Sequence, residues 1–388
     1  MIKAHTASIV HEDARIAGRD LALELLDELG DKPDLVLLFV SARYHLEAVV
    51  NGFHQACGPG VQVAGCSSYA EIDQIGGKTE SATAMGMKFG PKVSAKTLSA
   101  IVENNDSRAL GQRLGEEAKR AGANLLMVFP DGMKVNGTQF LLGLQDILGS
   151  SFPIIGGVAA DLGQFTETFQ IHDQKVFQGG ASVVALCGPI TLSTAAKSGW
   201  IPVGATRHAN RVENGNICLE IDGRPALDLY EEYLGPRAAE MPGVSVEFPI
   251  GLVGGVPSTQ RLDDDSILLL RAIKGVDRER RAIVFGGDLP EGAEIRMTTA
   301  TKTDVISGAD DASARALTNL PRASIALVFD CMARKVLLGP RYREELNRTF
   351  EQLGDIPRIG FYTYGELSPV QGVTMHHDET FTIALIGA

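Results

Sequence analysis

The side chains that could bind a ligand follow two neighbouring apolar runs near the C-terminus: Cys331, Arg334, Tyr362, Tyr364 and Glu366. The first run spans residues 323–329 and the second begins at residue 358. Both runs have the length and composition of buried strands. Ligands of α/β proteins bind beyond the carboxyl ends of such strands, where loops converge. These positions predict a binding site that combines a cation, a carboxylate, a thiol and aromatic rings.

The turn at residues 358–369 has two earlier counterparts in the chain, at residues 62–72 and 152–161. In each, an apolar strand runs into glycine, small residues and a carboxylate, and six of these residues are candidate ligand contacts: Gly65, Ser67, Glu71, Gly156, Gly157 and Asp161. Glycine allows the backbone to approach a ligand closely. The alternative is that these glycines and carboxylates only form and cap a tight turn.

The elements that position these residues also recur three times. The spacing from the phenylalanine that ends one strand to the next turn glycine is nearly constant: Phe39 to Gly65, Phe129 to Gly156, and Phe329 to Gly360. The repeating order is helix, strand, helix, strand, turn, strand. A strand–helix–strand step implies a parallel pair, and the added hairpin strand makes the sheet mixed. The predicted fold class is therefore α/β, with mixed sheets built from repeated units and a β-rich central segment.

At 388 residues the chain exceeds the size of a single core, so two or three core units are expected. We expect an α/β domain at residues 1–190 and a second domain at 191–388. The second domain contains a β-rich segment at 191–307 and the third α/β unit at 308–388. The β-rich segment is either a degenerate fourth unit or an insertion.

Composition excludes several classes of protein. A net charge of −12 and a pI near 5.2 argue against a nucleic-acid partner, which needs a concentrated basic face. The N-terminus has no signal-peptide pattern and no apolar run approaches 18 residues, so a cytoplasmic protein without membrane insertion is expected. The five cysteines contain no C-x-x-C pair, which predicts reduced thiols and no metal site. The sequence matches the phosphate-binding-loop motif and the nucleophile-elbow motif only in part, so neither site is predicted.

The motifs resemble those of the FIST sensory domain family over nearly the whole chain. The resemblance rests on residues 330–334, the turn at 358–369 and residues 375–380, on an Asp-Gly-x-x-Ala segment at 222–226, and on the two N-terminal turns. His377 departs from the pattern, in which asparagine is expected. The resemblance implies FIST N and FIST C halves, ligand sensing in bacterial signal transduction, and a signalling partner such as a histidine kinase of a two-component system.

Two ligand classes follow from the resemblance. An amino-acid-like ligand would place its carboxylate on Arg334 and its ammonium on Glu366. In the NosP-like subgroup, which binds haem and senses nitric oxide, haem would need an apolar slot and an axial ligand, for which the candidates are His376, His172, His208, Cys331 and Tyr362. We expect no enzyme activity; the alternative is an enzyme with Cys331 as nucleophile and His376 as its base.

Overall fold

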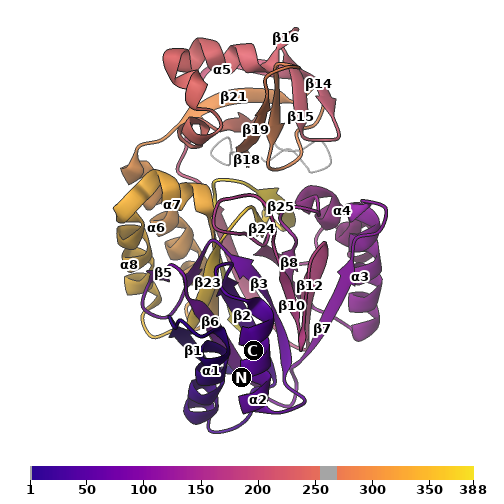
Figure 1. Ribbon diagram of the computed structural model, residues 1–388, viewed down its shortest axis with the longest axis vertical. Helices are drawn as coiled ribbons and strands as arrows, with labels where there is room; N and C mark the ends of the chain where they lie inside the picture. The colour runs from indigo at the N-terminus through magenta and orange to yellow at the C-terminus, as the bar shows by residue number, and fades with distance from the viewer. Residues whose placement is uncertain (1, 254–268) are drawn as a thin grey trace.

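The predicted repeat is present as three α/β units that form one body, with a small β-rich domain at one end (Figure 1). The computed structural model describes residues 2–253 and 269–388. The first unit contains β1 (Ile2–Ile9), α1 (Ala14–Leu29), β2 (Leu35–Ser41), α2 (Leu46–Cys57), β3 (Gln62–Ser68), β4 (Ala70–Ile72), β5 (Gly77–Lys78) and β6 (Ala82–Phe89). The second contains β7 (Ser94–Ile101), α3 (Ser107–Ala121), β8 (Leu125–Pro130), α4 (Gly137–Leu148), β9 (Ile154–Gly157), β10 (Gln170–His172), β11 (Lys175–Phe177) and β12 (Gly180–Cys187).

The third unit is interrupted by the small domain. It begins with β13 (Thr191–Lys197) and resumes with α6 (Lys302–Asn319), β22 (Ile325–Cys331), α7 (Met332–Leu338), α8 (Tyr342–Leu353), β23 (Arg358–Thr363), β24 (Glu366–Val370), β25 (Val373–His377) and β26 (Phe381–Gly387). Strand β13 pairs with β26 in the third sheet. The third unit therefore extends beyond the predicted 308–388, and the intervening segment is an insertion rather than a fourth repeat.

Each unit gives its hairpin to the sheet of another unit. The hairpin β4–β5 of the first unit pairs with β23 of the third, β10–β11 of the second with β3 of the first, and β24–β25 of the third with β9 of the second. The three six-stranded sheets of the described residues are therefore linked in a closed cycle. The predicted parallel pairs are confirmed in β2–β3, β8–β9 and β22–β23, and the antiparallel closing strands make the sheets mixed, as expected.

Three equivalent glycines permit the close approach of the parallel strands. Gly65 lies opposite Leu38, and a Cβ atom there would be 1.8 Å from the Leu38 carbonyl oxygen. A Cβ atom at Gly156 would be 2.0 Å from the Val128 carbonyl oxygen, and one at Gly360 would be 1.8 Å from the Val328 carbonyl oxygen. Such distances are far shorter than any van der Waals contact. The repeated glycine is thus required by the packing of the parallel strands, a structural role that differs from the tight turn considered as the alternative.

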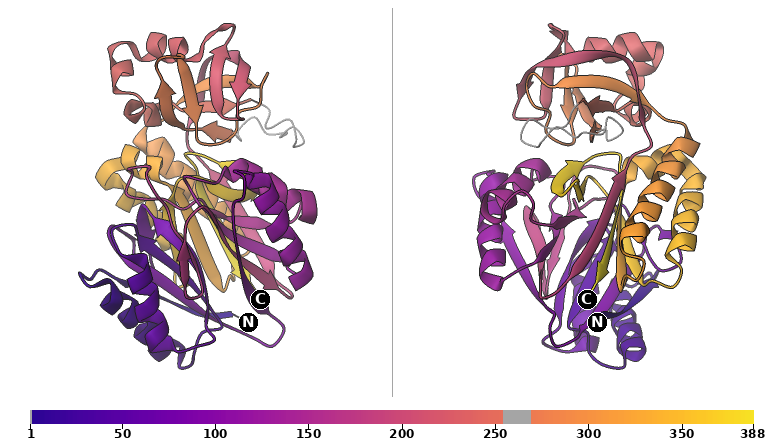
Figure 2. Two further views of the ribbon diagram at one scale, coloured as in Figure 1. Left: turned by 45° about the vertical axis from the view of Figure 1, so that its right-hand side comes forward. Right: turned by 180° about the vertical axis from the view of Figure 1, so that it is seen from behind.

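The three sheets face a shared core. Its centre is formed by the phenylalanines at the ends of the first parallel strands and by Phe361 of β23: Phe39, Phe129, Phe329 and Phe361. The ring centroids of Phe39 and Phe129 are 5.3 Å apart, and those of Phe39 and Phe361 are 4.5 Å apart. Helices cover the outer faces of the sheets, in pairs such as α1 with α2 and α3 with α4 (Figures 1 and 2). The body is therefore held together by apolar burial at its centre as well as by the exchanged hairpins.

The small domain has its own sheet and core. Its elements are β14 (Ile201–Glu213), β15 (Ile217–Ile221), β16 (Arg224–Pro225), α5 (Ala226–Leu234), β17 (Ile250–Leu252), β18 (Leu269–Arg271), β19 (Ile273–Asp277), β20 (Ala282–Phe285) and β21 (Glu294–Thr299). The chain passes between body and small domain twice, after β13 and before α6 (Figure 2). Val370 and Met375 of the exchanged hairpin β24–β25 pack into the small-domain core. The small domain therefore packs directly on this hairpin.

We predict that Gly360→Ala will destabilise the fold by about 3 kcal/mol or more, because the new methyl group would overlap the Val328 carbonyl oxygen. Urea denaturation followed by circular dichroism measures the loss. Gly76→Ala is the matched control, since a Cβ atom there would have nothing within 4 Å. Equal stability of the two variants would refute a packing requirement at Gly360.

Candidate functional site

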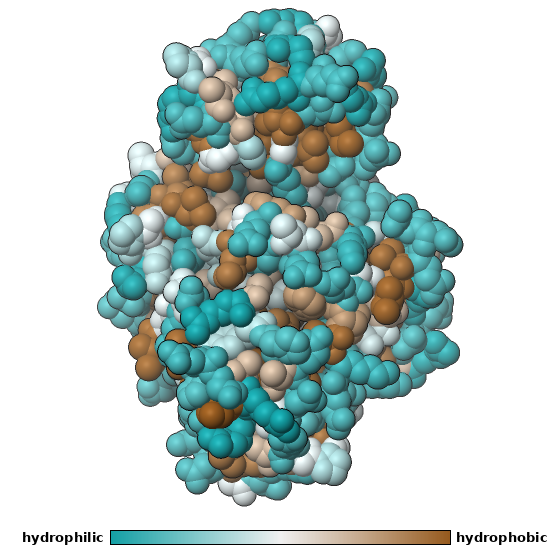
Figure 3. Space-filling view, viewed as in Figure 1, coloured by the Kyte–Doolittle hydropathy of each residue, from teal (hydrophilic) through white to brown (hydrophobic). Residues whose placement is uncertain are grey.

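A cavity of about 180 Å³ lies where the small domain meets the third unit. The body contributes the end of β22, the start of α7, the turn before β26 and a loop of the second unit, whereas the small domain contributes a 3-10 turn and β18–β19. Its lining is Phe165, Pro242, Gly243, Val246, Ala272, Ile273, Lys274, Cys331, Met332, Ala333, Val336, Tyr364, Asp378 and Glu379. Apolar side chains gather at this junction (Figure 3). The cavity is therefore at the predicted strand edge, but half of it is supplied by the inserted domain.

Four polar groups line this mostly apolar cavity: Lys274, Cys331, Asp378 and Glu379. Glu379 is buried, and neither carboxylate oxygen has a hydrogen-bond partner among the described residues. Burial and the neighbouring Asp378 raise the pKa of the Glu379 carboxyl group well above its usual range. Burial lowers the pKa of the Lys274 amino group, although its side chain is partly exposed, and burial raises the pKa of the Cys331 thiol. The uncharged forms of all three groups are thereby favoured.

Asp161 and Tyr364 hold an aromatic side chain at the edge of the cavity. The Asp161 carboxylate accepts hydrogen bonds from the backbone N–H groups of residues 163–167 and from the Tyr364 hydroxyl group. These bonds lower the pKa of Asp161 although burial opposes them. Phe165, in that loop, stacks on Tyr364 with ring centroids 4.6 Å apart. The structure thus brings Tyr364 and Cys331 to the site, and Asp161 positions the loop behind it.

Arg334 lies behind the cavity in an internal ion-pair network. Its side chain is fully buried, with Nε 2.8 Å from Asp330 Oδ1 and Nη2 hydrogen-bonded to Glu345 Oε1. The remaining N–H groups donate to backbone carbonyls, including that of Val305 at 3.0 Å. Burial and the charge of Glu345 raise the pKa of Asp330. Both terminal nitrogens of the Arg334 guanidinium are hydrogen-bonded within the protein and Nε faces the Asp330 carboxylate, so Arg334 is placed to support the start of α7 rather than to bind a ligand carboxylate.

Glu366 and Tyr362 are also buried outside the cavity lining. One carboxylate oxygen of Glu366 accepts a hydrogen bond of 3.2 Å from the Thr380 N–H, and the other has no partner in the described structure. Burial and the charge of Asp378 raise the pKa of Glu366. The Tyr362 ring packs edge-on against Tyr342, with centroids 6.2 Å apart. Neither residue is part of the cavity lining.

The first copy of the turn forms a separate polar cluster. Glu71 accepts hydrogen bonds from Ser68 Oγ at 2.5 Å and from Ser81 Oγ at 2.6 Å. Lys335 of α7 lies near it, with its amino group 4.6 to 5.7 Å from the ring centroids of Tyr69, Tyr342 and Tyr362. Ser67 accepts a 3.0 Å hydrogen bond from the Phe169 N–H, and Gly157 packs against Phe361 and Thr363. These residues join neighbouring units and lie outside the cavity.

The histidine candidates do not provide a haem site. His376 is buried and hydrogen-bonded to Thr138 at 2.8 Å, and a Cβ atom on Gly365 would lie 2.3 Å from its Nε2 atom. His172 and His208 lie on the surface in contact with acidic residues. A macrocycle needs an apolar slot several times larger than the cavity beside Cys331, and no described His lines that cavity. The residues present therefore do not fit haem, and residues 2–253 and 269–388 contain no cluster suited to a metal ion.

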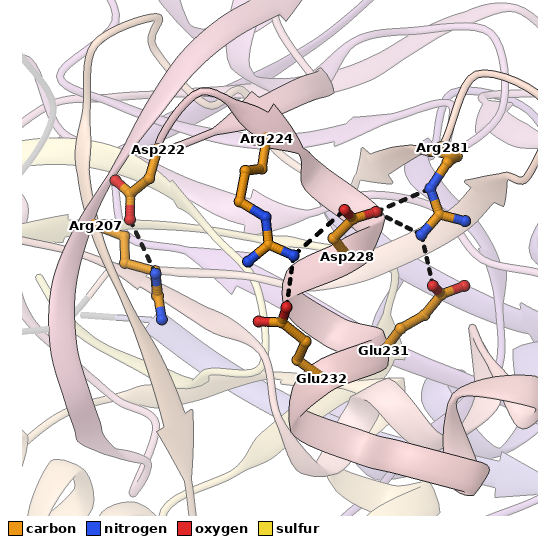
Figure 4. A network of polar contacts seen from close by, with 7 residues as sticks. All are labelled: Arg207, Asp222, Arg224, Asp228, Glu231, Glu232 and Arg281. Carbon is orange, nitrogen blue, oxygen red and sulfur yellow. Dashed lines mark hydrogen bonds and ion pairs between the residues drawn. The ribbon is translucent and has the colours of Figure 1, made fainter.

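The Asp-Gly-x-x-Ala segment has a structural role in the small domain. Asp222 ends β15 with a positive φ of 51° and accepts a 2.9 Å hydrogen bond from the His208 N–H. Nearby, Arg281 bridges Asp228 and Glu231, and Arg224 bridges Asp228 and Glu232 (Figure 4). These ion pairs are exposed to solvent and contribute little to stability individually. The segment builds the hairpin and the start of α5, away from the cavity.

Sequence reasoning missed the residues that the small domain brings to the site. Lys274 follows an apolar run without any motif, and only its position across from β22 reveals it. Asp378 and Glu379 belong to the C-terminal motif at residues 375–380, so the sequence did contain a signal for them. In that motif only the adjacent His376 was considered as a ligand-binding residue. Cys331 and His376 share no hydrogen bond in the described structure, and burial keeps the Cys331 thiol protonated. This arrangement does not favour a Cys–His nucleophile.

Family comparison matches the FIST N domain to residues 34–224 and the FIST C domain to residues 226–369. An uncharacterised protein of Mycobacterium tuberculosis is 24% identical over 379 residues, which cover 96% of each chain. One from Mycobacterium bovis is 26% identical over 384 residues with the same coverage, and one from Methanocaldococcus jannaschii is 26% identical over 61% of this chain and 49% of its own. A cyanuric acid hydrolase from A. caulinodans is similar in structure over 100% of this chain and 99% of its own, with a TM-score of 0.40 and 8% identity. No helix in the described part of the chain is long and apolar enough to cross a membrane.

We predict that Arg334→Ala will lower the free energy of unfolding by about 3 kcal/mol or more, because Asp330 and Glu345 would lose their buried cation. Thermal denaturation at neutral pH measures the loss. Arg348→Ala is the matched control, since Arg348 pairs with Asp310 and Glu344 on the surface and its removal should shift the midpoint little. A folded Arg334→Ala protein as stable as the control would argue against the structural role.

We predict that Glu71→Gln will change the pH dependence of stability. Burial raises the pKa of Glu71 from 4.5 to about 7, against the opposing hydrogen bonds from Ser68 and Ser81, with the Lys335 cation facing it. The native state therefore holds a proton that the unfolded chain releases, so stability present below pH 4.5 is lost as pH rises through about 7. Across this pH range, the free energy of unfolding of the wild type should fall relative to that of the variant by up to about 3 kcal/mol. A stability difference that stays constant from pH 5 to 8, measured by urea denaturation, would contradict this.

Proposed function

The chain belongs to the FIST family, and on this basis we propose that it is a sensory protein whose small-molecule ligand binds in the cavity between the α/β body and the small domain. The observation that carries the proposal is the Glu379 side chain. Its two oxygens have no partner among the described residues, although the side chain is buried and lines the cavity. A buried polar group without a partner is costly, and a ligand that supplies hydrogen bonds would remove that cost.

The size and chemistry of the cavity limit the ligand. Its volume of about 180 Å³ is below the roughly 300–1,000 Å³ of pockets for drug-sized molecules. Most of its wall is apolar, and only a few polar side chains, among them Lys274 and Glu379, line it. We therefore propose a compact ligand with an apolar body and one polar end. If the ligand is amino-acid-like, Lys274 and Glu379 replace Arg334 and Glu366 as the groups that face its carboxylate and its ammonium.

A ligand in this position would contact both the body and the small domain. The two are joined by two chain connections and by a polar contact in which buried Arg271 of β18 lies 4.0 Å from Asp378 and donates to the His376 carbonyl oxygen. Asp288 of the small domain accepts hydrogen bonds from Asn136 and Gln139 of the second unit. Filling the cavity would change the balance of these contacts and hence the relative position of the two parts. We propose that a cytoplasmic signalling partner, such as a histidine kinase, recognises this change.

A thermal-shift screen of small metabolites tests the site. One compound class should raise the melting temperature of the wild type. Val336→Trp should weaken the apparent affinity for that compound at least tenfold, because Val336 lines the cavity and is 47% exposed. Val10→Trp is the matched control, since Val10 is 57% exposed on the body and does not line the cavity. A thermal shift of unchanged size in Val336→Trp would show that the ligand binds outside this cavity. The absence of a thermal shift with every compound would count against small-molecule sensing.

A further inference from the structure

Lys274 is an amine placed in surroundings that suit a nucleophile rather than a surface cation. It lies at the start of β19 and lines the cavity together with Cys331 and Met332 of the third unit. Among the described residues it forms no hydrogen bond and no ion pair; the nearby Asp378 carboxylate instead accepts the Gly287 N–H at 3.0 Å and faces Arg271. Within residues 2–253 and 269–388 the amine therefore has no hydrogen-bond or ion-pair partner that would explain its position.

We propose that the cavity accepts a small aldehyde or ketone and that Lys274 holds it as an imine, a covalent and reversible form of ligand capture. The inference rests on the proposed function, because it names the ligand class of the same site. Two features of the geometry point to it. The amine and the unpartnered Glu379 carboxyl group line one cavity but come from the two different parts of the molecule. The remaining wall is apolar, and it would suit a carbonyl compound better than a charged ligand.

The bond changes of the capture step balance without any co-reactant. The neutral Lys274 amine attacks the carbonyl carbon, and one N–H proton moves to the oxygen to give a carbinolamine. The carbinolamine then loses its hydroxyl group as water while the nitrogen gives up its second proton, which leaves a C=N bond. A carboxyl group in its protonated form can donate the proton that the departing hydroxyl group needs, and Glu379 lies in the cavity with both oxygens available.

The environment favours the reactive form of each participant. Burial lowers the pKa of the Lys274 amine although Asp378 opposes the shift, so more of the amine is neutral than on an exposed lysine. Burial and the adjacent carboxylates raise the pKa of the Cys331 thiol, so it remains protonated and competes weakly for the carbonyl group. Burial and Asp378 raise the pKa of Glu379, which favours the protonated carboxyl group that can donate a proton. The cavity thus contains one favoured nucleophile and one acid.

The experiment traps the imine in the full-length wild-type protein. Benzaldehyde or cyclohexanone is added at pH 7 with sodium cyanoborohydride, which supplies hydride to the C=N bond and converts the imine into a stable secondary amine. Peptide mass spectrometry then gives the labelling rate of each lysine. Lys274 should be labelled at least tenfold faster than the exposed Lys175 and Lys92, since each unit by which the amine pKa falls raises its neutral fraction about tenfold. Labelling of Lys274 should saturate with probe concentration, whereas labelling of Lys175 should rise linearly.

Four variants separate a binding site from a merely reactive amine. Lys274→Arg keeps a long basic side chain but removes the amine that forms the imine, so it should remove only this label and leave Lys175 unchanged. Val336→Trp should slow Lys274 labelling at least tenfold, and Val10→Trp should leave it unaffected. Glu379→Gln keeps hydrogen-bonding capacity without an acidic proton, and should slow trapping more than it weakens probe binding.

Labelling of native Lys274 at or below the rate of Lys175 would overturn the imine proposal. If a metabolite still stabilises the wild type but not Val336→Trp, the sensory cavity stands and only covalent capture is refuted. If Lys274 is trapped faster than Lys175 but is equally labelled in Val336→Trp, the amine reacts without using the cavity, and the proposed ligand site is refuted instead.

Discussion

The architecture depends on a steric constraint at the second strand of each parallel pair. Gly65, Gly156 and Gly360 lie directly against backbone carbonyl oxygens of the first strand, and no larger residue fits there. Each glycine lets its strand approach and then continue into a hairpin that leaves its own unit. The hairpins pair with the next sheet in a cycle, so no unit has a complete sheet by itself. The cooperativity of the body follows from this exchange together with the shared phenylalanine core.

The same cycle accounts for the location of the cavity. In the first two units, the strand-end turns are occupied by internal bonds: Glu71 binds two serines, and Asp161 binds a run of backbone N–H groups. In the third unit, the corresponding edge carries the small domain, which rests on the exchanged hairpin β24–β25. The cavity that contains Glu379 lies there, between two separately built parts of the chain. The three copies of the turn are therefore equivalent in packing and unequal in chemistry.

The polar residues around the cavity fall into two groups, one that supports the start of α7 and one that lines the cavity. Arg334 neutralises Asp330 and Glu345 and fixes the start of α7, from which Met332, Ala333 and Val336 reach the cavity. Glu379 and Lys274 lie in the lining and have no such partners among the described residues. Ion pairs that are satisfied within the protein hold an element in place, whereas unpaired polar groups at a cavity are free to bind. This distinction decides which motif residues support the site and which can contact a ligand.

The sequence by itself determined the three α/β units, their parallel strand pairs and the mixed sheets. Those features depend on local periodicity and on the repeated glycine, which act over a few tens of residues. The tertiary structure alone decided that the hairpins are exchanged and that residues 201–299 form an inserted domain. It also decided that Arg334 is internally neutralised and that Lys274 lies across from Cys331. These outcomes depend on contacts between residues far apart in the chain, and no local pattern specifies which distant partner will satisfy a buried charge.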